Sequence, residues 1–84
     1  MPTTHELKIW PEPFTAVYTG RKAFEIRSEA DRTFAVGDTL HLREFKPLAQ
    51  EYTGRDVLVR VMYLVRGPDW GIPEGTVVMS ILQL

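Results

Sequence analysis

An alternation of apolar and polar residues from Asp56 to Arg66 constrains the fold more than any other feature of the sequence. Every second position of this segment is apolar: Val57, Val59, Val61, Tyr63 and Val65. Successive side chains of a β-strand point to opposite faces, so a period of two predicts a strand with one buried face. Because a single strand cannot bury that face alone, the rest of the chain must supply a sheet.

Four further segments carry a strand signal. Each alternates or is rich in β-branched and apolar residues, and turn-forming residues separate them. They are His5–Trp10, Ala23–Ser28, Thr39–Phe45 and Thr76–Leu82. In the second of these, Phe24 and Ile26 share one face, while Glu25 and Arg27 share the other. Residues 46–54 are predicted to be a polar connection.

One short helix is predicted between the first two strands. Pro11 and Pro13 fit the first turn of a helix, where the N–H that proline lacks has no partner in any case. Phe14 and Val17 then lie on one face. Gly20 stands where a left-handed residue commonly ends a helix.

Five strands and one helix within 84 residues predict a mainly β (α+β) fold. The connections are too short for parallel crossovers, so we expect a mostly antiparallel, strongly curved sheet. A small five-stranded barrel capped by the helix would also remove the exposed strand edges. The composition, with 44% hydrophobic and 25% charged residues, is typical of a single globular domain spanning residues 1–84.

Composition also excludes several classes of site. The absence of cysteine excludes disulfides, iron–sulfur clusters, thiolate zinc sites and thiol nucleophiles. His5 and His41 lack metal-ligand spacing, so neither a metal nor another cofactor is predicted. The net charge of −1 requires any anion site to be a local patch. No signal peptide and no apolar run of about 20 residues is visible, so we expect a cytoplasmic monomer without a membrane partner.

A group of charges follows the predicted helix directly. Residues 20–27 read Gly-Arg-Lys-Ala-Phe-Glu-Ile-Arg, and strand parity places Glu25 and Arg27 on one face, roughly 6.6 Å apart along the strand. Two interpretations stay open from the residues alone. The charges share a ligand at the rim of a cleft, or they form a solvated strand face with an ion pair worth about 0–1 kcal/mol.

The same segment resembles the G-x-K-x-x-E-x-R motif of ASCH (activating signal cointegrator homology) domains, which belong to the PUA-like superfamily. Gly20, Lys22, Glu25 and Arg27 match its four fixed positions. Most of the chain also resembles a compact bacterial and phage ASCH-like family of unknown function, through residues 5–11, 24–27, 31–32, 36–38, 42–44 and 52–55. The resemblance implies a PUA-like β-barrel with a cleft beside the helix, lined by the motif's lysine, glutamate and arginine, that binds RNA or a nucleotide.

Three other residues are candidates for the same site. Lys8 and Trp10 lie on the polar side of the first strand, where Trp10 either stacks a base, worth about 1–3 kcal/mol, or packs over the start of the helix. His5 belongs to a block that resembles the family and is also predicted to bind the ligand. Trp70, in a loop, either closes over a ligand or plugs the end of the barrel.

We therefore expect a binding module for RNA or a nucleotide, in which Lys22 and Arg27 neutralise phosphates and Glu25 accepts hydrogen bonds from a base edge. The alternative is a small hydrolase. One ASCH branch consists of amidohydrolases of acetylated cytidine in which a lysine activates a threonine. Here Glu25 occupies the threonine position, so either Glu25 would act as a general base for water or Lys22 itself would act, on a modified nucleoside or RNA. A protein–protein adaptor has no positive sign in the sequence.

Overall fold

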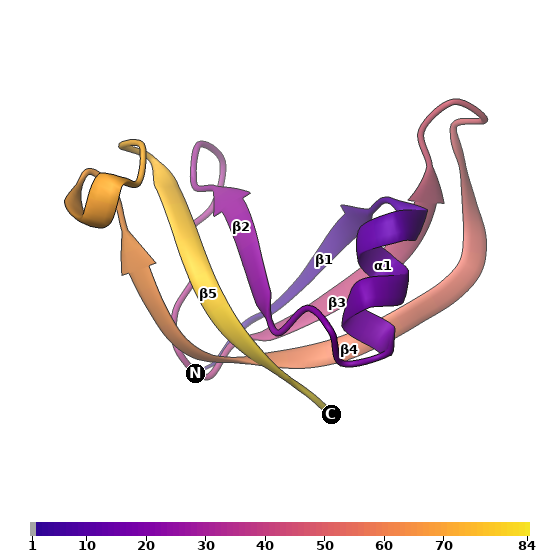
Figure 1. Ribbon diagram of the computed structural model, residues 1–84, viewed down its shortest axis with the longest axis horizontal. Helices are drawn as coiled ribbons and strands as arrows, with labels where there is room; N and C mark the ends of the chain where they lie inside the picture. The colour runs from indigo at the N-terminus through magenta and orange to yellow at the C-terminus, as the bar shows by residue number, and fades with distance from the viewer. Residues whose placement is uncertain (1) are drawn as a thin grey trace.

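The computed structural model describes residues 2–84, which form five β-strands and one α-helix (Figure 1). In chain order the elements are β1 (Thr4–Ile9), α1 (Pro11–Tyr18), β2 (Phe24–Ser28), β3 (Thr39–Lys46), β4 (Glu51–Arg66) and β5 (Thr76–Gln83). A 3-10 turn, η1 (Asp69–Gly71), lies between the last two strands. The five predicted strands and the helix are confirmed. Gly20 has a φ of 81°, as its predicted place after the helix requires.

The strands form one mixed sheet in the order β1-β3-β4-β5-β2. Strands β3, β4 and β5 are antiparallel neighbours in the middle, and β2 adds to β5 antiparallel. The sheet curves into a half-barrel that holds α1 on its inner side (Figure 1). No hydrogen-bonded ladder joins β1 to β2 within residues 2–84, so the half-barrel is open between these two edge strands. The predicted mainly β fold with a mostly antiparallel, curved sheet and one helix is confirmed, but the described part of the sheet does not close into the expected barrel that would remove its edges.

One pair of strands contradicts the expectation that the connections are too short for a parallel crossover. β1 runs parallel to β3, from Thr4 opposite Thr39 to Ile9 opposite Glu44. The prediction considered only connections between consecutive strands. β1 and β3 are separated by α1 and β2, and this excursion gives the chain the length that a parallel crossover needs.

Strand β4 is longer than predicted and changes face within its length. It begins at Glu51, inside the segment predicted to be a connection, because a hairpin turn at residues 47–50 joins it directly to β3. The first three valines of the alternation are buried, but Tyr63 is 68% exposed. Pairing with β5 slips by one residue between Val61 and Tyr63, and this bulge turns Leu64 toward the core instead.

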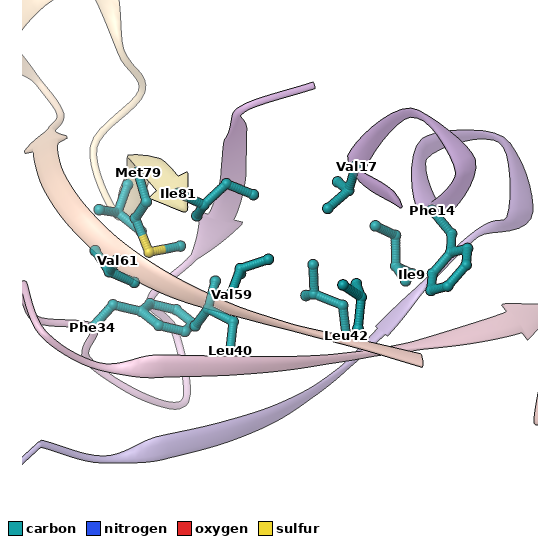
Figure 2. Close-up of a cluster of buried hydrophobic side chains, with 12 residues drawn as sticks. Ile9, Phe14, Val17, Phe34, Leu40, Leu42, Val59, Val61, Met79 and Ile81 are labelled. Carbon is teal, nitrogen blue, oxygen red and sulfur yellow. The ribbon is translucent and has the colours of Figure 1, made fainter. Parts of the chain in front are cut away.

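The hydrophobic core fills the inner face of the half-barrel (Figure 2). Phe14 and Val17 of α1 are 0% and 2% exposed and pack against the sheet. Full burial of such a side chain contributes about 1.5–3 kcal/mol. These two anchors therefore fix the helix against the sheet, and the end of the helix determines where the chain enters β2.

Candidate functional site

A cleft of about 280 Å³ opens where the two edge strands face each other beside the start of α1. One wall comes from the end of β1 and the first turn of α1, and the other from β2 and the residues before it. The lining residues are Lys8, Ile9, Trp10, Pro13, Lys22, Phe24, Glu25, Ile26 and Arg27. Five of the six residues predicted to bind a ligand thus lie together, and His5 is the exception.

Glu25 connects two cations of this cleft. Its Oε1 accepts a hydrogen bond from Nζ of Lys22, and its Oε2 accepts one from Nε of Arg27 at 2.9 Å. The Glu25 side chain is 3% exposed, and those of Lys22 and Arg27 are 20% and 23% exposed. The interpretation of this strand face as a solvated surface is therefore wrong. The charged face of β2 points inward, while Phe24 and Ile26 on its other face are substantially exposed.

The end of α1 delivers Lys22 to this position. The N–H of Gly20 donates to the carbonyl of Val17 at 3.0 Å, and the N–H of Lys22 donates to the carbonyl of Ala16 at 2.9 Å. These bonds satisfy carbonyls that the helix end leaves free, and the positive φ of Gly20 allows the tight reversal they require. The reversal places Lys22 just before β2, three residues from its partner Glu25.

Arg27 spans the open seam of the half-barrel. Its Nη2 donates to the backbone carbonyl of Lys8 on β1 at 3.1 Å, while its Nε holds Glu25 on β2. A guanidinium can serve both because its N–H donors point in several fixed directions. The side chain of Arg27 therefore joins two strands that share no backbone ladder, and it forms the floor of the cleft between them.

The cleft carries positive charge in a protein whose net charge is −1. Lys8, Lys22 and Arg27 oppose the single carboxylate of Glu25, which leaves a local charge of +2. Nζ of Lys22 lies 5.0 Å from the ring centroid of Phe24, which also lines the cleft, whereas Nζ of Lys8 lies 4.3 Å from that of Phe45, which does not. The arrangement has the charge and the donors of a local anion site.

A protein-family model, described as a domain of unknown function (DUF3850), matches residues 4–81. The chain belongs to the DUF3850 family. The match includes every residue that lines the cleft, so the cleft is part of the DUF3850 domain itself. A comparison with curated proteins finds no match. The relation of this DUF3850 domain to ASCH domains stays a prediction.

The two tryptophans of the DUF3850 domain have different surroundings. Trp10 directly precedes α1, lines the cleft and is 62% exposed, so its ring is available to a ligand rather than committed to packing. Trp70 lies in η1 and is 81% exposed. The interpretation of Trp70 as a plug of the barrel is therefore wrong, and Trp70 does not line the cleft.

His5 is the predicted site residue that the fold keeps away from the cleft lining. Its ring is 6% exposed, packs on Phe34 and places Nε2 2.8 Å from Oδ2 of Asp38. Burial alone would raise the pKa of Asp38, but hydrogen bonds from the N–H of Thr3, from His5 and from the N–H of Ala35 outweigh it and hold that pKa below its usual value. The partners of His5 give it a structural role.

Two findings concern chemistry elsewhere in residues 2–84. No group of three His, Asp or Glu side chains there is arranged to hold a metal ion, and His41 pairs with Asp56. No helix in the same range is both long and apolar enough to cross a bilayer.

Sequence reasoning missed the apolar part of the cleft. Ile9 and Pro13 were assigned only to a strand and a helix start, and Phe24 and Ile26 only to the strand face opposite Glu25. All four line the cleft, because β2 is an edge strand and both of its faces border the open seam. Pro13 lies one helical turn after the predicted site residue Trp10, and this spacing could have indicated that Pro13 lines the helix side of the cleft.

Proposed function

We propose that this DUF3850 domain binds one unpaired nucleotide, either free or within single-stranded RNA, in the cleft between β1 and β2. The observation that carries the proposal is the pairing of Lys22 and Arg27 with one buried carboxylate at the wall of a cleft of local charge +2. The resemblance of residues 20–27 to the ASCH motif supports the same conclusion. It makes a relation between this DUF3850 domain and PUA-like ASCH domains part of the proposal.

The cations keep donors for a ligand after pairing with Glu25. An ammonium has three N–H donors and a guanidinium five, and only some of these reach Glu25 or the carbonyl of Lys8. Phosphate oxygens accept such charge-assisted bonds at low cost, because the cations are already held in place. Glu25, whose two oxygens both accept bonds within the chain, positions the cations and is not the main contact to a base edge. Lys8 adds the third positive charge, and Trp10 offers a stacking surface to a base.

The size of the cleft selects a small ligand. Ligand pockets typically measure about 300–1,000 Å³, and this cleft, at about 280 Å³, lies at the lower limit. It has room for part of one nucleotide and none for a duplex. A strand of RNA therefore binds through one splayed nucleotide, which is the common mode of single-strand recognition.

The cleft gives less support to the alternative function of a small hydrolase. A general base needs an oxygen that faces the attacking water, and both oxygens of Glu25 are engaged by Lys22 and Arg27. The residues that line the cleft include no hydroxyl nucleophile. Binding of an anionic ligand, in contrast, requires only the paired cations Lys22 and Arg27 in their present positions.

Binding assays with a matched cation control test the proposal. We expect ribonucleoside 5′-monophosphates and a short single-stranded RNA to bind and its duplex form not to bind. Lys22→Ala should weaken binding about tenfold or more, since it removes a charge-assisted contact. Arg60→Ala removes an exposed cation of β4 outside the cleft and should leave affinity unchanged. Equal losses for the two variants, or binding of the duplex, would contradict the proposal.

Salt dependence and turnover complete the test. Affinity for single-stranded RNA should fall with salt by about 0.7 logarithmic units per contacted phosphate for each tenfold rise, and Lys22→Ala should lower this slope. Incubation with N-acylated nucleosides and labelled RNA tests the hydrolase. Turnover that Glu25→Gln abolishes would replace the binding module with the enzyme.

A further inference from the structure

A second hollow, of about 260 Å³, lies on the other side of Lys22, between the end of α1 and the sheet. Its lining is mostly apolar, in contrast to the charged cleft. The residues are Val17, Gly20, Lys22, Ala23, Val59, Ile81, Leu82 and Gln83. Lys22 lines both spaces, so the two hollows adjoin at this residue.

The floor of this hollow is the hydrophobic core. Val17, Val59 and Ile81 are 2%, 0% and 8% exposed, and Figure 2 shows Val17 on the helix side with Val59 and Ile81 on the sheet side. The rim is made by small residues. A Cβ atom at Gly20 would meet nothing within 4 Å, and Ala23 carries only a methyl group. The hollow therefore has an apolar base of tightly packed core residues and is bordered by small residues.

The only polar side chains of the lining sit at its borders. Lys22 contributes an ammonium group, and the amide of Gln83 contributes both donors and an acceptor. A space with apolar walls and a few polar groups at its edge fits a flat heteroaromatic ring, whose faces are apolar and whose edge forms hydrogen bonds. A nucleotide combines such a ring with an anionic phosphate.

We propose that this hollow is the base subsite, and the charged cleft the phosphate subsite, of a single nucleotide that straddles Lys22. The inference rests on the proposed function and deepens it. The phosphate meets Arg27 and Lys22, the base enters under the end of α1, and Gln83 meets the base edge. In a longer strand, Trp10 then stacks the neighbouring base at the opposite end of the cleft.

Filling the hollow tests this assignment. Ala23→Leu adds a side chain at the mouth, and the backbone carbonyl of Ala23 still accepts its bond from the N–H of Ile81. Ala49→Leu makes the same change on the exposed hairpin turn and is the control. Adenosine 5′-monophosphate should bind Ala23→Leu about tenfold more weakly than the wild type, because the added side chain takes the space that the base would occupy. Ribose 5-phosphate should bind both variants like the wild type.

Methyl NMR of the wild-type chain keeps the test valid if Ala23→Leu does not fold. The nucleotide, but not ribose 5-phosphate, should shift the methyl signals of Val17, Val59 and Ile81. If the nucleotide binds in a Lys22-dependent way while these methyls stay unmoved and Ala23→Leu binds normally, the base subsite is refuted and the proposed function stands. If neither phosphate compound binds, the proposed function falls together with the subsite.

Discussion

Replacing Glu25 with glutamine tests the claim that the cleft is held together by a buried ionic cluster. The substitution keeps the size and shape of the side chain but removes its charge. One amide oxygen can still accept a hydrogen bond, while the new NH₂ group faces a cation that is itself a donor. Lys22 and Arg27 are then left mostly buried without a counter-ion.

The expected loss of stability is about 2–3 kcal/mol. A hydrogen bond to a charged group contributes about 1.5–3 kcal/mol net, and breaking a fully buried ion pair costs about 3–5 kcal/mol. The expected loss lies below that of a fully buried pair, about 3–5 kcal/mol, because the side chains of Lys22 and Arg27 keep 20% and 23% of their surface in contact with water. For a domain of this size such a loss lowers the Tm by roughly 8–24 °C.

Urea unfolding followed by far-UV circular dichroism measures the effect, with an unchanged m-value as the sign that only stability differs. Glu6→Gln is the matched control. Glu6 also lies on an outer strand and pairs with an arginine, with its Oε1 3.0 Å from Nη1 of Arg43, but these side chains are 58% and 35% exposed. That pair should contribute less than about 1 kcal/mol. If Glu25→Gln costs no more than Glu6→Gln, the reasoning about burial is refuted.

Three further measurements test other parts of the structure. The pKa of Asp38 is lowered, so its carboxylate stabilises the fold above about pH 4, and this contribution is lost as the pH falls through that pKa. The free energy of unfolding of Asp38→Asn should therefore decline less in acid than that of the wild type. Parallel curves of unfolding free energy against pH would disprove the stabilising bonds of Asp38. A methyl group at Gly67 would clash with the backbone carbonyl oxygen of Pro73, so Gly67→Ala should lower the free energy of unfolding by about 3 kcal/mol. A Tm equal to that of the wild type would be inconsistent with this contact. Tyr63→Thr should change stability by less than about 0.5 kcal/mol because the bulge exposes Tyr63, whereas a large loss would mean that the alternation continues through it.

Local patterns in the sequence predicted the elements of the fold. Alternation identified the first four strands and a β-branched, apolar run the last, and the prolines and Gly20 delimited the helix, because these signals depend only on neighbouring residues. The bulge after Val61 and the parallel pairing of β1 with β3 depend on contacts between distant segments. The alternation of residues within one strand predicts neither the bulge nor the partner and direction of the strand.

The candidate site was likewise predictable where it depends on neighbouring residues and not where it depends on distant segments. The motif and strand parity correctly grouped Lys22, Glu25 and Arg27, but they did not show that this face of β2 is the inner one. The sequence also did not show that His5 lies away from the cleft lining, because its partner Asp38 is brought to it by a turn far along the chain. The second hollow had no sequence signal of its own, because its core residues come from three elements that are distant in the sequence, α1, β4 and β5, and only the fold brings them beside Lys22.

The parallel pairing of β1 with β3 has a consequence for the order of folding. Strands β3, β4 and β5 are joined by short connections and can form as successive hairpins, whereas β1 must wait for β3, which is made much later in the chain (Figure 1). The two outer strands are then the last to dock and the first to separate in partial opening events. A ligand held between them therefore slows amide hydrogen exchange in β1 and β2 more than in the central hairpins.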